Sequence, residues 1–124
     1  MKLTPNFELS EFEDRSGATM PASVKANILL LAKELQVLRN HLGKPVEITS
    51  GYRSPARNAA TPGAAQNSTH ISGKGADFKV AGMTMRQLYN VIEKLIREGK
   101  MKEGGLGYYA NHIHYDIRGK KARW

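Results

Sequence analysis

The clearest hydrophobic pattern lies between residues 23 and 42, where large apolar residues return every three or four positions. This spacing places them on one face of a helix that packs against a core. Ser23 is a favourable N-cap, Gly43 suits the position just past the helix, and Pro45 prevents continuation. We therefore predict the main core helix here, with an apolar face made of Val24, Ile28, Leu31, Leu35, Leu38 and Leu42.

Two further segments carry helix-start patterns. Thr84 and Gln87 have the spacing of a capping box, which predicts a helix that ends at Gly99. Its apolar positions are Leu88, Val91, Ile92, Leu95 and Ile96. Near the start of the chain, Ser10 and Glu13 have the same spacing and predict a short helical turn. Its apolar anchors would be Phe7, Leu9 and Phe12.

Short apolar runs predict four strands, at residues 46–50, 76–80, 106–109 and 112–118. Residues 59–75 are rich in small and polar residues and predict a long loop, and long loops in compact domains are usually functional or disordered. This order of elements favours an α+β fold with a small, mostly antiparallel sheet packed on two main helices.

The last predicted strand has two different faces. Residues with even numbers and residues with odd numbers point to opposite sides, because side chains alternate along a strand. The apolar set, Ile113, Tyr115 and Ile117, belongs to the core. The polar set therefore points into a cleft or to solvent, and it comprises His112, His114, Asp116 and Arg118.

Length and composition narrow the class of protein. The chain has 124 residues, 40% of them hydrophobic and 24% charged, which predicts one ordinary soluble domain over residues 1–124. It contains no cysteine, so disulfide scaffolds and thiol catalysis are excluded and a metal would need His and carboxylate ligands. No apolar run reaches the length of a membrane span, and the first 20 residues lack the apolar segment of a signal peptide.

Charge is distributed unevenly along the chain. The net charge is +8, yet residues 1–20 carry more acidic than basic groups, so the excess lies in the rest of the chain. A polyanionic partner is therefore plausible, whether a nucleic acid, a membrane surface or an anionic wall polymer. Nucleic acid is the weakest of these, because aromatic residues make up only 7% and no base-stacking motif is present.

Five of the seven histidines and aspartates of the chain lie in two short segments. One segment contains His70 and Asp77, and the other contains His112, His114 and Asp116. A catalytic zinc site needs three nitrogen or oxygen ligands and one open position. His70, Asp77 and one of the two C-terminal histidines would supply this set. Taken singly, each of these residues is more often a surface or capping residue than a ligand, so the metal hypothesis depends on the cluster.

Spacing limits how these residues can meet. His112 and His114 lie on one face of the predicted strand with their Cα atoms about 7 Å apart, so one can bind the metal while the other lies near the metal-bound water. Glycines between His70 and Asp77 allow the loop to fold back, so that both reach one ion. We interpret the remaining histidine, His41, as a charge at the end of the first helix.

Two sets of short motifs, in a fixed order, resemble those of a known family. The first reads S-G-Y-R-S-P from Ser50 to Pro55, followed by Asn58, Ser68, Thr69, His70, Gly73, Ala76 and Asp77. The second reads G-L-G-Y-Y from Gly105 to Tyr109, followed by His114, Tyr115, Asp116, Arg118, Arg123 and Trp124. The first set resembles the signature of the zinc D-alanyl-D-alanine carboxypeptidases, a family that includes phage L-alanyl-D-glutamate endolysins. The second set is similar to the ending of its short bacterial and phage branch, and the resemblance covers nearly the whole chain.

The resemblance implies a hedgehog/DD-peptidase-like fold and a zinc peptidase that hydrolyses an amide bond in peptidoglycan stem peptides, as a D,D-carboxypeptidase or an endopeptidase. It implies His70, Asp77 and His114 as the ligands of Zn²⁺. It places Arg53 beside the metal, where a guanidinium can hold a substrate carboxylate or stabilise an oxyanion. Ser68 is expected to bond either the loop backbone or the substrate, Tyr109 to contact the substrate, and Asn58 to brace the turn.

One position departs from the family pattern. Several members carry an acidic general base three residues before the last histidine ligand, where this chain has Asn111. An amide cannot accept a proton in that role, so His112 and Asp116 are the candidates for proton transfer. Asp116 has a second reading, in which it only orients Arg118 or a ligand.

Asn111 also motivates an alternative, in which the protein is a non-catalytic zinc-containing module that binds the cell wall. In either case we expect a monomer that binds peptidoglycan and the anionic wall. The missing signal-peptide pattern predicts synthesis in the cytoplasm, followed by release through a holin or a virion, unless the sequence is part of a longer chain.

Overall fold

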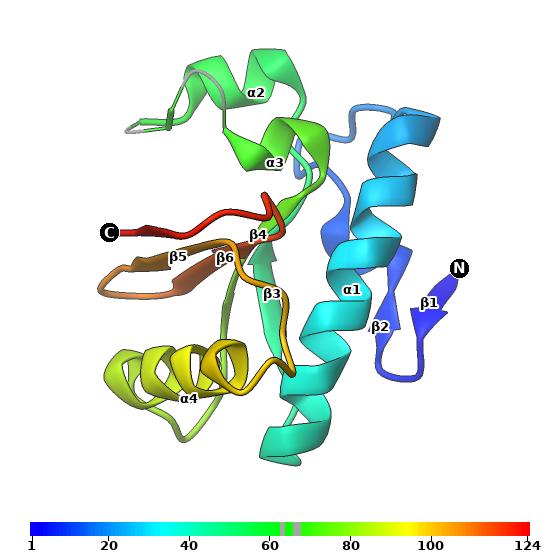
Figure 1. Cartoon of the computed structure of the whole chain (residues 1–124). Helices are drawn as coiled ribbons and strands as arrows, with labels where there is room; N and C mark the ends of the chain where they lie inside the picture. The colour runs from blue at the N-terminus through cyan, green and yellow to red at the C-terminus, as the bar shows by residue number, and fades with distance from the viewer. Residues whose placement is uncertain (63, 66–67) are drawn as a thin grey trace.

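A computed structural model describes residues 1–62, 64–65 and 68–124 (Figure 1). Its centre is a five-stranded sheet in the order β3-β4-β6-β5-β7. Neighbouring strands are antiparallel except β5 and β7, which are parallel, so the prediction of a mostly antiparallel α+β fold is confirmed. The strands are β3 Glu47–Ser50, β4 Gly75–Lys79, β5 Gly105–Tyr108, β6 Ile113–Asp116 and β7 Ala122–Arg123.

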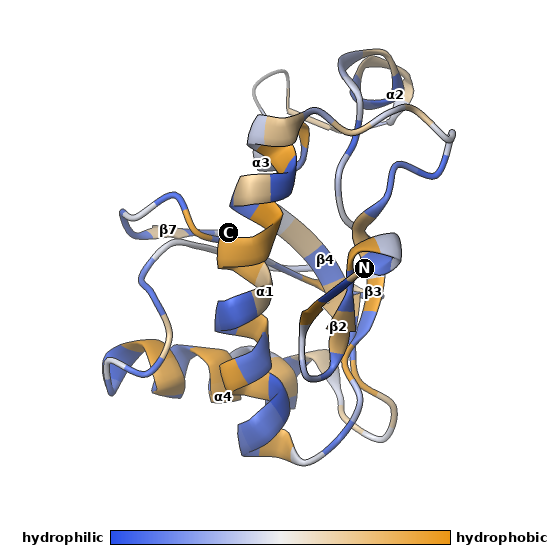
Figure 2. Cartoon of the chain, turned by 90° about the vertical axis from the view of Figure 1, so that its right-hand side faces the viewer, coloured by the Kyte–Doolittle hydropathy of each residue, from blue (hydrophilic) through white to orange (hydrophobic). Residues whose placement is uncertain are grey.

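Two long helices complete the core: α1 spans Ala22–Leu42 and α4 spans Met85–Arg97. Figure 2 shows hydrophobic and hydrophilic residues alternating along the turns of both helices. The apolar faces join the inner face of the sheet in one hydrophobic cluster, where Leu35, Leu88 and Tyr115 are fully buried. Among the described residues, no helix combines the length and the apolar character needed to cross a bilayer.

The start of α1 differs from the prediction, and its end does not. Ser23 is not the N-cap, because Pro21 takes that position in extended conformation and the helix begins at Ala22. At the other end Gly43 adopts φ 65°, and its N–H donates to the carbonyl of Arg39 at 3.0 Å. This left-handed position is the ending that a glycine permits. The predicted apolar face is buried except at Leu42, which is half-buried at the last position of the helix.

The capping box of α4 is present as predicted, with Thr84 and Gln87 each accepting a hydrogen bond from the other's backbone N–H. Leu88, Ile92 and Leu95 are buried, and Val91 and Ile96 are partly buried. The helix ends at Arg97, and Gly99 follows it with φ 74°.

The N-terminal region has more structure than its sequence predicts. Strands β1 (Lys2–Thr4) and β2 (Phe7–Glu8) form a small separate hairpin, and a 3₁₀ turn, η1 (Leu9–Phe12), follows. The predicted cap at Ser10 and Glu13 is wrong, because Glu8 is the N-cap and pairs with Glu11 in the capping box. Phe7 and Phe12 are buried in the core, as predicted for the anchors of this turn.

The predicted loop at 59–75 contains short helices. Helix α2 spans Pro55–Ala60 and α3 spans Thr69–Ser72, while residues 63, 66 and 67 lie outside the described part. The Ser68 hydroxyl caps α3 by accepting a hydrogen bond from the His70 N–H at 3.1 Å. One helical turn thus carries a histidine to the end of the sheet, beside β4 and β6 (Figure 1).

Candidate metal centre and cleft

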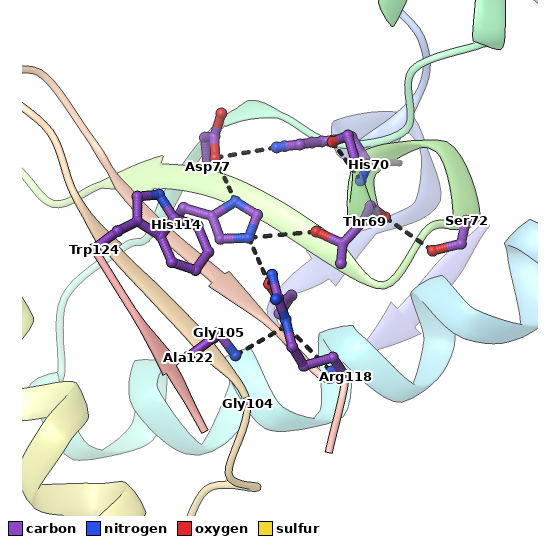
Figure 3. Close-up of polar contacts among 12 residues, drawn as sticks. Thr69, His70, Ser72, Asp77, Gly104, Gly105, His114, Arg118, Ala122 and Trp124 are labelled. Carbon is purple, nitrogen blue, oxygen red and sulfur yellow. Dashed lines mark hydrogen bonds and ion pairs between the residues drawn. The ribbon is translucent and has the colours of Figure 1, made fainter. Parts of the chain in front are cut away.

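Three predicted metal ligands meet at one point (Figure 3). His70 comes from α3, Asp77 from β4 and His114 from β6, and Asp77 and His114 are direct partners across the two strands. All three residues are buried, and one ligand atom from each lies within 4.8 Å of the others. Among the described residues this is the one such group of three, so clustering in the sequence predicted a real cluster in space.

The hydrogen bonds behind the histidines fix which nitrogen faces the centre. Asp77 Oδ1 lies 3.2 Å from His70 Nε2 and 3.0 Å from His114 Nδ1. The opposite nitrogens face acceptors, since His70 Nδ1 lies 2.7 Å from the Gly51 carbonyl and His114 Nε2 lies 2.8 Å from Asp116 Oδ2. In the neutral rings the outer nitrogens therefore carry the protons, and two lone pairs and a carboxylate oxygen converge on the centre.

The electrostatics of the cluster favour a cation. Burial raises the pKa of Asp77, but its contacts with His114 and His70 outweigh this effect and hold that pKa well below its usual range. Burial lowers the pKa of His114, but Asp116 and Asp77 outweigh it and leave the pKa raised. The site thus attracts positive charge to the place where the three acceptor atoms meet.

These residues fit a zinc ion. Two imidazoles and one carboxylate are ligands that zinc takes, and each imidazole has an acceptor behind it, as metal-binding histidines usually do. Three protein ligands leave a position for water or substrate, which is the pattern of catalytic zinc sites.

Asp116 supports His114 from behind. It is fully buried, and its Oδ1 accepts hydrogen bonds from Gly105 N at 2.9 Å and Arg118 Nε at 2.8 Å. Its Oδ2 faces His114, and Arg118 Nη2 lies 2.8 Å from it. Because its oxygens are engaged in this way, the geometry favours the orienting role over proton transfer.

Gly105 makes room for that carboxylate. A Cβ atom at Gly105 would lie 2.8 Å from Asp116 Cγ, closer than packed atoms approach. The first glycine of the G-L-G-Y-Y motif is thereby explained by packing against Asp116.

A cleft of about 680 Å³ opens above the three ligands, and Arg53 lies on its wall. Arg53 Nη2 lies 3.4 Å from Asp77 Oδ2, and Nη1 donates to Asn58 Oδ1 at 3.3 Å. The buried Asn58 in turn donates to the Ala65 carbonyl at 2.8 Å. Asn58 therefore braces the turn, as the motif implies, and holds Arg53 beside the metal centre.

His112 also lines the cleft, next to the carboxylate of the centre. Its Nε2 lies 3.6 Å from Asp77 Oδ2, and its ring stacks on Tyr109 with the centroids 4.4 Å apart. Burial lowers the pKa of His112, and although Asp77 raises it, the net shift is downward, which favours a neutral imidazole near pH 7. Asn111 is exposed and does not line the cleft.

The remaining predicted contacts lie on the rim of the cleft. Ser68 and Tyr109 both line it, and the Tyr109 hydroxyl accepts a hydrogen bond from Trp124 Nε1 at 2.7 Å. His41 lies apart from the site, exposed in the last turn of α1 as interpreted from the sequence.

Sequence reasoning assigned no role to Thr69 or Trp124, although both belong to the motifs. Thr69 Oγ1 lies 3.3 Å from His114 Nε2, and the ring of Trp124 lies 5.2 Å from that of His114. Both residues line the cleft. Their place in the ordered motifs was the signal that could have found them.

Comparison with known proteins agrees with this geometry. The peptidase M15 family profile matches residues 5–116. The chain is 39% identical over 77 residues to the probable peptidoglycan L,D-endopeptidase MepK of Haemophilus influenzae, covering 57% of this chain and 38% of that protein. It is 35% identical over 102 residues to MepK of Escherichia coli, covering 76% and 52%. It is also 28% identical over 109 residues to the zinc D-Ala-D-Ala carboxypeptidase of Streptomyces albus G, covering 87% and 41%.

The chain spans about half the length, or less, of these curated relatives. The family profile nevertheless covers most of this chain, including all three residues of the metal centre. The fold, the cluster and the matched profile together place this chain in the peptidase M15 family.

Proposed function

We propose that this protein is a zinc peptidase that hydrolyses an amide bond in peptidoglycan stem peptides. The observation that carries the proposal is the buried group of His70, Asp77 and His114 at the base of an open cleft. Arg53 and His112 on the cleft wall supply a cation and a proton acceptor within reach of it.

Each residue of the site has a role in such a reaction. His70, Asp77 and His114 would hold a zinc ion, which would supply the Lewis acidity needed to polarise the scissile carbonyl and to activate water. The Arg53 guanidinium binds the substrate carboxylate or the oxygen that becomes negative as the carbonyl turns tetrahedral. His112 Nε2 accepts the proton of the attacking water and returns it to the leaving amine. Asp116 and Arg118 keep His114 in the orientation that binding requires.

His112 argues against the non-catalytic alternative. That alternative was motivated by Asn111, which lacks the acidic group found at this position in several relatives of the family. His112, the next residue along the chain, brings a basic nitrogen to the cleft, with its Nε2 3.6 Å from Asp77 Oδ2. Proton transfer therefore does not need an acid at position 111.

We further propose that the enzyme cuts inside the stem peptide, between an L- and a D-configured residue. The support is similarity, because both MepK relatives named above are called peptidoglycan L,D-endopeptidases and exceed the carboxypeptidase in identity. Removal of a terminal D-alanine is the competing outcome.

The cell wall is the proposed place of action, as a phage-type lysin or a wall-remodelling enzyme. The net charge of +8 favours attraction to anionic wall polymers. The ligands, Arg53 and His112 all come from one chain, so we propose that a monomer suffices.

Digestion of purified peptidoglycan followed by mass spectrometry of the muropeptides tests this proposal. The zinc-loaded protein should produce fragments whose masses identify one cleaved amide bond, and Asp77→Asn should produce none. Glu47→Gln, which removes an exposed carboxylate from β3, should match the wild type. Undigested peptidoglycan with the zinc-loaded wild type would refute a hydrolytic function.

A further inference from the structure

Asp14 is a buried carboxylate outside the metal centre, in the segment between η1 and α1. Its side chain is 0% exposed. Its Oδ1 accepts hydrogen bonds from the backbone N–H and the hydroxyl of Ser16. Its Oδ2 accepts the backbone N–H of Ser54 at 2.5 Å, and Arg57 Nη1 lies 3.8 Å from Oδ1. None of the proposed catalytic steps uses this residue.

The backbone on both sides of Arg53 is attached to this N-terminal segment. Tyr52 N donates to the Phe12 carbonyl at 2.8 Å, and Ser54 N donates to Asp14. Arg53 N itself donates to the His70 carbonyl at 3.1 Å, so its position is fixed relative to the metal centre as well. Three successive N–H groups thus have partners, and two of those partners come from residues 12–14.

Packing reinforces these hydrogen bonds. A Cβ atom at Gly51 would lie 2.6 Å from Phe12 Cα, so the two backbones approach as closely as a glycine allows. The Gly51 carbonyl is also the acceptor that orients His70. Nearby, Arg15 Nη2 donates to the Ile48 carbonyl at 3.0 Å, which attaches the same segment to β3.

We propose that Asp14 is a positioning residue that holds Arg53 at the metal centre by fixing the backbone N–H of Ser54. A charged acceptor makes a stronger hydrogen bond than a neutral one, and its burial removes competition from water. Arg53 has a flexible side chain, so its reach depends on a fixed backbone. The inference rests on the proposed function, since it concerns the residue that binds the substrate there.

The test is a double-mutant cycle with Asp14→Asn and Arg53→Ala, measured as kcat/KM on a soluble muropeptide. In the asparagine variant a neutral amide replaces the buried carboxylate as the acceptor for the N–H groups of Ser16 and Ser54. We expect kcat/KM to fall about 10- to 100-fold, because small displacements of a substrate-binding group cost this much. In the Arg53→Ala background the same change should cost less than about twofold, because its effect passes through Arg53. Zinc affinity should stay within about threefold of wild type, since the ligands remain in place.

Glu13→Gln is the matched control, because it removes a neighbouring carboxylate that is exposed, and it should match the wild type. Equal losses in both Arg53 backgrounds, or no loss, would overturn the positioning role. An inactive wild type would overturn the proposed function, and this inference with it.

If Asp14→Asn does not fold, amide hydrogen exchange of the wild type tests the hydrogen bond between Ser54 and Asp14 instead. The Ser54 N–H should exchange at least about 100-fold more slowly than in an unfolded chain, although it precedes α2 and has no partner within that helix. Rapid exchange of this amide would contradict the hydrogen bond on which the inference depends.

Discussion

At the scale of single residues, the structure distinguishes the roles of His112 and Asp116, which the sequence left as alternative candidates for proton transfer. His112 and Asp116 lie on the same face of the C-terminal segment, and either could have transferred a proton. Asp116 is fully buried and engaged by His114, Arg118 and Gly105. His112 is 28% exposed at the cleft and has a lowered pKa, so we propose it as the group that exchanges protons with the substrate.

Replacing His112 by glutamine tests this assignment. We expect kcat to fall about 100-fold or more with little change in zinc affinity, because general bases contribute factors of this size. Steady-state kinetics on a soluble muropeptide, with zinc titrated by calorimetry, measures both quantities. His41→Gln is the matched control at an exposed position. Wild-type kcat in His112→Gln would assign proton transfer to another group.

Asp14 predicts a dependence of stability on pH. Burial raises the pKa of Asp14, but hydrogen bonds from Ser16 and Ser54 outweigh it and lower the pKa from 3.8 to about 2. A carboxyl with a lower pKa in the folded state stabilises it above pH 3.8, and this contribution disappears as the pH falls towards 2. Its size is about 2–3 kcal/mol, because one pKa unit corresponds to about 1.4 kcal/mol.

Urea unfolding between pH 7 and pH 2 measures this contribution. The free energy of unfolding of the wild type should fall more steeply than that of Asp14→Asn below pH 4, so that the difference between them shrinks. A constant difference across that range would show that the Asp14 carboxylate does not contribute this pH-dependent stability.

At the scale of elements, β5 approaches β6 closely enough to bury Asp116, and this depends on Gly105. Gly105→Ala should displace Asp116, weaken its support of His114 and reduce zinc affinity about 10- to 100-fold, the usual cost of losing such support. Thr84→Ala, which removes the cap of α4 at a cost of about 1 kcal/mol, controls for a general loss of stability. Calorimetric titration with zinc distinguishes lost support of His114 from a general loss of stability. Equal zinc affinity in Gly105→Ala and Thr84→Ala would contradict the role of Gly105.

Elements in which apolar residues recur at regular spacing over several turns could be predicted from the sequence, and very short elements could not. Helices α1 and α4 span enough turns for apolar spacing and capping residues to agree on them. Strands β1, β2 and β7 have only two or three residues, too few for alternation to show. Helix α3 is one turn of mostly polar residues, formed because Ser68 caps it and its neighbours hold it.

The same limit applies to the site. His70, Asp77 and one of the two C-terminal histidines could be predicted because the chain has few histidines and aspartates and most of them lie in two segments. The choice of His114 over His112 came from the resemblance to the family. Asp14 could not, because its partner Ser54 lies 40 positions away and only the fold brings them together.

At the scale of the whole molecule, the net charge of +8 predicts how the enzyme reaches its substrate. Attraction to an anionic wall is screened by salt, with a Debye length of about 10 Å at 0.1 M and about 3 Å at 1 M. Raising the salt should therefore slow hydrolysis of intact cell walls much more than hydrolysis of a soluble, uncharged muropeptide fragment. Parallel rate measurements on both substrates test this, and an equal salt dependence would contradict it.

Zinc dependence of amide hydrolysis tests the central claim most directly. Protein freed of metal by a chelator should not cleave purified peptidoglycan, and activity should return in proportion to bound zinc, reaching a plateau at one zinc per chain. His70→Ala should bind zinc weakly and remain inactive under the same conditions. Undiminished hydrolysis by the metal-free protein, or by His70→Ala, would contradict a zinc peptidase built on His70, Asp77 and His114.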